Sequence, residues 1–131
     1  MVKKVFVADF ETTVYSGQKN TEVWAAALVE LNTENVIIDT SIEAHFQTIR
    51  NQKGNILVYY HNLKFDGSFW LDYLLKNSNF SQAIDANKQF CTDKQMPNNS
   101  YKYSISNRGQ WYTIIIRVDN RFIEIRDSLK L

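Results

Sequence analysis

The chain has 131 residues, of which 44% are hydrophobic, and a formal net charge of +1 at pH 7. This length and composition fit a single folded domain that buries roughly two-thirds of its unfolded surface, and they exclude a largely disordered chain. No apolar run approaches the roughly 20 residues of a membrane span, and the start lacks a signal-peptide core. One cysteine, Cys91, excludes an internal disulfide. We expect a cytoplasmic protein without a membrane partner.

The charge is unevenly distributed along the chain. A net charge of +1 is too small for a non-specific coating of DNA, so any affinity for nucleic acid must be local or supplied by further domains. Residues 102–131 carry six basic and three acidic side chains. Basic residues there either flank a phosphate backbone or form a solvated hairpin face. They are Arg108, Arg117, Arg121, Arg126 and Lys130.

Apolar runs and turn residues predict the elements of the first 76 residues. Strands are expected at residues 5–8, 23–29, 36–39 and 56–60. Ser41 is a candidate N-cap for a short amphipathic helix that ends before Gly54. A second helix is expected over residues 67–76. Its core-facing residues would be Phe69, Trp70, Tyr73 and Leu74. Trp24 is also expected in the core.

The second half of the chain predicts a loop followed by strands. Residues 77–100 are rich in polar side chains and show no sustained period, so we interpret them as a long, mobile loop. Strands are then expected at residues 103–106, 111–118 and 121–126. A tight turn at Asp119-Asn120 joins the last two into a hairpin with one solvated face.

Two carboxylates follow the first predicted strand directly. Asp9 and Glu11 are two residues apart, and alternation along a strand aims both to one side. Two like charges so close are unfavourable unless a cation joins them. Mg²⁺ or Mn²⁺ suits such a site, because these hard cations prefer carboxylate oxygen and no cluster of Cys or His is present to favour zinc.

A second acidic stretch repeats this design after the strand at residues 56–60. Residues 61–67 read His-Asn-Leu-Lys-Phe-Asp-Gly and lead into the second helix. Asp66 would lie at the helix entrance, where the helix dipole favours a carboxylate, and could face Asp9. Asn62 and Phe65 supply an amide and an aromatic face for an unpaired base. An Asp-x-Glu pair alone is more often a surface pair; the second stretch makes a metal site the better interpretation.

Three motifs in order resemble those of a known family. Residues 9–13 (Asp-Phe-Glu-Thr-Thr) and 62–67 (Asn-Leu-Lys-Phe-Asp-Gly) are similar to the first and second exonuclease motifs of the protein-primed DNA polymerases of family B. Residues 127–130 (Asp-Ser-Leu-Lys) are similar to a further motif of this family, which helps to hold the single-stranded primer end. The resemblance extends from about residue 4 to the last residue. It implies a 3′–5′ proofreading exonuclease with an α/β, ribonuclease H-like fold: a mixed central sheet flanked by helices, with an added hairpin near the C-terminus. We interpret residues 1–131 as a single 3′–5′ exonuclease domain, and we expect it to be truncated before the family's last exonuclease motif.

The resemblance also implies residue roles. Asp9, Glu11 and Asp66 would be the metal ligands and catalytic residues of a two-metal hydrolysis of the terminal phosphodiester, with Mg²⁺ or Mn²⁺ as cofactor. The residues expected to contact DNA are Thr12, Tyr59, His61, Asn62, Phe65, Phe69, Ser128 and Leu129. The family's third motif, Tyr-x-x-x-Asp, is absent from the sequence. We therefore expect the chain by itself to cleave DNA weakly or not at all.

The implied partners are the 3′ end of single-stranded DNA, the priming terminal protein and the polymerase domain of a parent chain. A phage, prophage or plasmid in a bacterial host would be the source. Two other functions stay open. One is a binding module that grips single-stranded 3′ ends without cutting them. The other is a free-standing 3′–5′ exonuclease of the ribonuclease H-like group, which the Asp-Ser-Leu-Lys motif disfavours.

Overall fold

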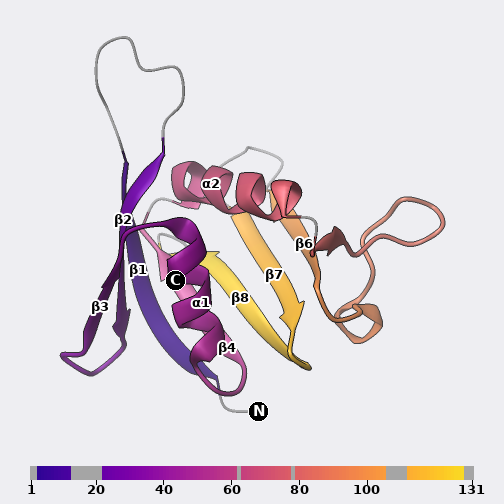
Figure 1. The fold of residues 1–131 in the computed structure, drawn as a ribbon. Helices are drawn as coiled ribbons and strands as arrows, with labels where there is room; N and C mark the ends of the chain where they lie inside the picture. Colours follow the sequence, from indigo (N-terminus) through magenta and orange to yellow (C-terminus); the bar gives the residue numbers. More distant parts are fainter. Residues whose placement is uncertain (1–2, 13–21, 62, 78, 106–111, 129–131) are drawn as a thin grey trace, which may run out of the picture.

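The computed structural model describes residues 3–12, 22–61, 63–77, 79–105 and 112–128. These residues form one mixed sheet with two α-helices on the same side of it (Figure 1). The strands are β1 (Lys4–Thr12), β2 (Val23–Glu30), β3 (Val36–Asp39), β4 (Ile56–Tyr60), β5 (Ser81–Gln82), β6 (Ser100–Ile105), β7 (Tyr112–Val118) and β8 (Arg121–Asp127). The helices are α1 (Ile42–Asn51), α2 (Leu63–Lys76) and a short 3₁₀-helix, η1 (Asp93–Gln95).

The centre of the sheet consists of three parallel strands. The strand order is β3-β2-β1-β4-β8-β7-β6-β5, and β4 pairs in parallel with both β1 and β8. On the two outer sides of these three strands, β2 pairs antiparallel with β1 and β7 pairs antiparallel with β8. Because parallel strands run in one direction, β1, β4 and β8 all end at the same edge of the sheet. Residues that follow these three strands are therefore brought together.

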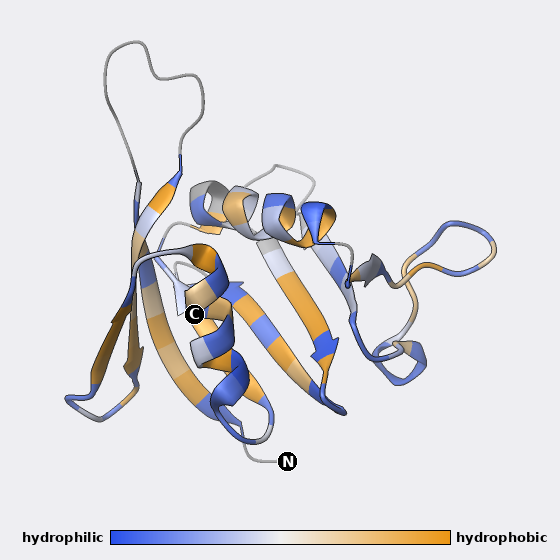
Figure 2. Cartoon of the chain, viewed as in Figure 1, coloured by the Kyte–Doolittle hydropathy of each residue, from blue (hydrophilic) through white to orange (hydrophobic). Residues whose placement is uncertain are grey.

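One face of the sheet carries the hydrophobic core, and the other is open. Along β1, Phe6, Ala8 and Phe10 are buried beneath the helices, whereas Val7 on the opposite face is 40% exposed. This alternation follows from the period of two in a strand. Figure 2 shows hydrophobic residues along β1 and β7 and mostly hydrophilic turns at the ends of the strands. The open face is the one toward which Asp9 also extends.

The predicted strands and both helices are confirmed. Ser41 caps α1, because its hydroxyl accepts a hydrogen bond of 3.1 Å from the backbone N–H of Ala44. Asp119 and Asn120 both adopt positive φ, which suits the two-residue turn between β7 and β8. α2 begins at Leu63, four residues before the predicted start at Gly67. A helical glycine costs only about 1 kcal/mol relative to alanine, and packing of buried Leu63 outweighs it.

Three expectations need correction. Residues 77–100 are not a structureless loop, because they contain β5, η1 and a bridge between Ile84 and Phe90. Their Phe80, Ala83 and Met96 are buried, so this segment contributes apolar contacts. The C-terminal hairpin is not an addition to the sheet: β8 is a central strand that pairs with β4.

The last correction concerns Trp24, which is 55% exposed and not in the core. Its position on β2 has the parity of the buried residues Ala26 and Leu28, but it is the second residue of the strand, near its start. Trp70 is fully buried, as expected. Within the described part of the chain, no helix is long and apolar enough to cross a membrane.

Candidate metal and nucleic-acid site

The carboxyl ends of β1, β4 and β8 define the site. The registers place Ala8 beside Tyr60, and Tyr60 beside Asp127. Asp9 and His61 therefore follow at neighbouring positions on the same edge. The sheet topology brings together three segments that are about fifty to sixty residues apart in sequence.

Asp9 and Glu11 lie on the open side of β1. Both are exposed, and Phe10 between them is buried on the helix side. This confirms the expectation that alternation would aim the two carboxylates to one side. The pairing of β1 with β2 becomes irregular between Glu11 and Thr12, at the end of the strand.

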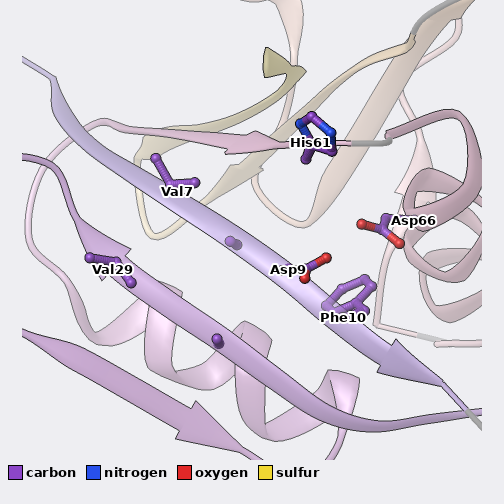
Figure 3. A pocket seen from close by; sticks show the side chains of 8 residues that line it. Val7, Asp9, Phe10, Val29, His61 and Asp66 are labelled. Carbon is purple, nitrogen blue, oxygen red and sulfur yellow. The ribbon is translucent and has the colours of Figure 1, made fainter. Parts of the chain in front are cut away.

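Asp66 faces Asp9 across a pocket of about 430 Å³. Asp66 lies in the first turn of α2 and is only 4% exposed. In Figure 3 the side chains of Asp9 and Asp66 extend toward one another, with His61 beside them. The pocket is lined by Val7, Ala8, Asp9, Phe10, Ala27, Val29, His61 and Asp66.

The site holds Asp66 in an unfavourable environment for a carboxylate. Burial is the largest cause that raises the pKa of Asp66, and the negative charges of Asp9 and Asp127 raise it further, to about 7. A divalent cation between these oxygens would lower the pKa of Asp66 again, because its positive charge stabilises the ionised carboxylates. Carboxylate oxygens are the donors that Mg²⁺ and Mn²⁺ prefer.

Asp127 is a further carboxylate that acts on Asp66. The sequence does not indicate this role. It is 3% exposed at the end of β8 and acts on Asp66 through its charge. The Asp-Ser-Leu-Lys motif contains it, but its role depends on β8 lying beside β4. That pairing joins strands sixty residues apart, and no local pattern reveals it.

A buried polar network supports the site from behind. The Oη atom of Tyr60 accepts a hydrogen bond of 2.9 Å from Trp70 Nε1 and lies 2.6 Å from His45 Nε2. All three residues are fully buried. The rings of His45 and Tyr60 lie 5.3 Å and 5.2 Å from the ring of Phe10. The network thus joins α1, β4 and α2 beneath the residue between Asp9 and Glu11.

His45 is neutral at pH 7 in this network. Burial lowers the pKa of His45 to about 4, against a smaller opposing effect of Asp39. Its Nδ1 atom has no hydrogen-bond partner among the described residues. No local sequence pattern connects His45 with the second motif, because the two lie on different elements.

The residues expected to contact DNA surround the pocket in part. His61 is exposed and lines it, and Phe69 is partly buried with its ring 6.3 Å from that of Phe10. Tyr59, Thr12 and Ser128 are half-buried at or near the ends of β4, β1 and β8. Asn62 and Leu129 lie outside the described residues, as does the side chain of Phe65.

The structure does not bring all three predicted ligands into one pocket. Glu11 shares a face of β1 with Asp9 but does not line the pocket that Asp9 and Asp66 share. Among the described residues, no group of three or more Asp, Glu, His or Cys side chains has an arrangement that could hold a metal ion. Asp9 and Asp66 thus line one pocket, and Glu11 does not line it.

Comparison with known proteins places this geometry in context. No family model matches the sequence. The DNA polymerase of Bacillus phage B103 is 33% identical over 117 residues, which cover 88% of this chain, and that of Streptococcus phage Cp-1 is 27% identical over 96% of it. This chain is a homologue of the phi29-like phage DNA polymerases. It spans only about a fifth of the length of these relatives, 18% and 21% respectively.

Solved structures of a phi29-like polymerase share the fold. Phi29 DNA polymerase complexed with primer-template DNA and incoming nucleotides matches 99% of this chain with a TM-score of 0.77 and 28% identity. The same polymerase complexed with single-stranded DNA matches with a TM-score of 0.75 and 27% identity. In both cases 21% of the polymerase is covered. The mixed α/β arrangement described above is therefore that of a region within a phi29-like polymerase.

Proposed function

We propose that this chain is the 3′–5′ exonuclease part of a protein-primed family B DNA polymerase. It would remove the terminal nucleotide of a single strand by hydrolysis of the last phosphodiester. The observation that carries the proposal is the convergence of Asp9 and Asp66 on one pocket, in a chain homologous to DNA polymerases. The layout, with helices over one face and carboxylates at the end of β1 and in the first turn of α2, supports the proposal of a ribonuclease H-like nuclease.

Asp9, Glu11 and Asp66 would hold two ions of Mg²⁺ or Mn²⁺. When bound, such ions activate a water molecule and stabilise the leaving oxygen. The contribution of the chain is to supply carboxylate oxygens at a half-enclosed edge. Asp66 must lose its proton to bind a cation, and its pKa of about 7 makes that step sensitive to pH near neutrality. Glu11, exposed on the side of Asp9, supplies a further oxygen donor when a ligand gathers the carboxylates.

The 3′ end of single-stranded DNA is the proposed substrate. His61, Tyr59 and Phe69 present rings near the pocket, and bases without a complementary strand stack on such rings. Thr12 and Ser128 add hydroxyl groups near the ends of β1 and β8. Asn62, Phe65 and Leu129 complete the proposed set on the basis of the motifs. The terminal protein and the polymerase region of a parent chain are the further proposed partners.

The experiment that tests this function measures binding to a 3′ end and its dependence on the carboxylates. A fluorescent single-stranded oligonucleotide is titrated with the chain in Mn²⁺, and shortening from the 3′ end is followed in parallel. We expect binding that requires Mn²⁺ and is weakened at least tenfold in Asp9→Asn and Asp66→Asn, with slow shortening at most. Equal DNA affinity of the unaltered chain and both variants would overturn the nuclease proposal.

Asp72→Asn provides a matched control for these variants. Asp72 is on α2 like Asp66, but it is exposed and pairs with Lys76 at 3.1 Å on the helix surface. The substitution removes the same charge from the same helix. It should leave Mn²⁺-dependent binding unchanged, because an exposed i,i+4 pair contributes little to the fold or to the pocket.

A non-catalytic module that binds single-stranded 3′ ends is the second candidate. The observation in its favour is that, in the described part of the chain, no three metal-binding side chains are grouped for an ion. Such a module would take up little Mn²⁺ and would keep its DNA affinity in Asp9→Asn. The titration above separates the two functions, because only the nuclease couples DNA binding to the metal.

A further inference from the structure

The open face of the sheet carries a basic side chain close to the candidate site. Val7 pairs with Tyr59 across β1 and β4, and Tyr59 pairs with Arg126 across β4 and β8. These three residues form one row, about 10 Å wide at roughly 4.8 Å per strand. Val7 lines the pocket of Asp9 and Asp66. Arg126 therefore lies two strands from the pocket, near the same edge of the sheet.

A shared ion pair orients Arg126. Its Nε and Nη2 atoms lie 2.9 Å and 2.6 Å from Oε1 of Glu124, while Lys3 Nζ lies 2.6 Å from Oε2 of the same carboxylate. Glu124 is almost buried, whereas the side chains of Lys3 and Arg126 are 41% and 47% exposed. Two cations thus share one anion, and the cluster keeps a net charge of about +1 toward solvent.

The position of the Arg126 guanidinium favours binding of a phosphate and contributes little to the stability of the fold. A guanidinium has five N–H donors in a planar fork, and Glu124 and the Tyr59 hydroxyl engage only part of that fork. The Arg126 side chain is about half exposed, and Lys3 also pairs with Glu124, so Arg126 itself contributes little to the fold. The carboxylates of Asp9, Asp66 and Asp127 repel a DNA backbone that approaches the pocket, so a strand needs a positive charge beside them. Tyr59, next to Arg126 in the row, adds an aromatic ring, and rings combined with arginine are typical of single-strand grooves.

We propose that Arg126 binds a backbone phosphate of the single strand, upstream of the terminal bond, and that Glu124 is the positioning residue that holds its guanidinium. The ligand is therefore a phosphodiester, and the strand crosses β4 and β8 on the open face of the sheet. This inference rests on the proposed function, since it names a contact for the same DNA end.

The test is a salt titration of DNA binding. Anisotropy of a labelled single-stranded oligonucleotide is measured in Mn²⁺, at several salt concentrations, for the unaltered chain and for Arg126→Gln. One lost phosphate contact should make the slope of log K against log salt shallower by about 0.7 and weaken binding about fivefold at 0.1 M salt. Arg126→Lys keeps the charge and should keep the slope, with a smaller loss of affinity.

Arg50→Gln is the matched control. Arg50 pairs with Asp119 through Nε at 2.8 Å and Nη2 at 3.0 Å, and Asp119 precedes β8, at the opposite end of the strand from Arg126. The control removes the same charge and a similar ion pair, and it should leave affinity and slope unchanged. Melting temperatures of both variants should match that of the unaltered chain.

The possible outcomes separate the two proposals. A loss specific to Arg126→Gln supports the phosphate contact. Equal affinity and slope in Arg126→Gln, Arg50→Gln and the unaltered chain would overturn that contact and leave the proposed function standing. Absence of any binding by the unaltered chain would overturn both.

Discussion

Asp66, buried in the first turn of α2, and Asp9, exposed on β1, face the same pocket and repel one another (Figure 3). The fold keeps this pair although burial and like charge both oppose ionisation of Asp66. Residues that serve binding are commonly arranged at such a cost to stability. The metal-free chain should therefore carry a measurable penalty at this position.

The first prediction concerns Asp66→Asn in the presence of a chelator. The folded pKa of about 7 lies above the ordinary value of 3.8, so the folded state holds the proton more tightly than the unfolded state. The contribution of Asp66 to stability therefore falls as pH rises from about 4 to 7, by roughly 2–4 kcal/mol. Asparagine cannot ionise, so Asp66→Asn should be the more stable protein at pH 8. At pH 4 the difference should nearly disappear.

Urea unfolding at pH 4, 6 and 8 measures this difference. Asp72→Asn again serves as control, because Asp72 is exposed on the same helix and the substitution removes the same charge. A variant Asp66→Asn that is less stable than the unaltered chain at pH 8 would contradict the repulsion described here.

The second prediction concerns the buried histidine. The folded pKa of His45 is about 4, below its ordinary value of 6.5, so the unfolded state binds a proton that the folded state excludes. This contribution to stability is lost as pH falls from about 6.5 to 4, by roughly 2–3 kcal/mol. It opposes the effect of Asp66 in the same range. The unaltered chain should therefore show a flat pH profile there.

His45→Phe isolates one of the two effects. The variant loses the contact with Tyr60 and about 1 kcal/mol at pH 7. Without the histidine, only the protonation of Asp66 remains, so stability of the variant should rise as pH falls from 6.5 to 4. Chemical unfolding at both pH values checks the sign of the slope. An unchanged flat profile would show that His45 does not titrate as described.

The third prediction concerns the hydroxyl group of Tyr60. Tyr60→Phe leaves the buried indole N–H of Trp70 without its acceptor and also removes the partner of His45 Nε2. Loss of a buried partner should cost about 1–3 kcal/mol of unfolding free energy. Tyr59→Phe, at the half-buried preceding residue, should cost less than about 1 kcal/mol of unfolding free energy. Equal costs in the two variants would argue against the network.

Much of the fold was accessible from sequence because its signals are local. The strands at residues 36–39 and 56–60 and the Ser41 cap depend on neighbouring residues alone, and all were found. The side to which Asp9 and Glu11 point also follows from alternation. The sequence predicts that α2 starts at Gly67, because glycine favours a turn locally. The helix starts four residues earlier, at Leu63, because packing of the buried Leu63 outweighs that preference.

The parts that were missed depend on long-range pairing. The place of Asp127 beside Asp66 requires β8 to lie next to β4, and the contact of His45 with Tyr60 requires α1 to cross behind that strand. A large apolar side chain such as Trp24 predicts a core position, but Trp24 lies near the start of β2 and is exposed. The sequence predicts Glu11 as a ligand together with Asp9, whereas Glu11 does not line the pocket that Asp9 shares with Asp66.

Calorimetric titration of the chain with Mn²⁺ at pH 7.5 tests the central claim most directly. If Asp9 and Asp66 form a cation site, the unaltered chain should take up Mn²⁺ with release of protons, because Asp66 is partly protonated near neutrality. Uptake should fall at least tenfold in affinity in Asp66→Asn and remain unchanged in Asp72→Asn. No uptake by the unaltered chain, or equal uptake in Asp66→Asn, would contradict the account.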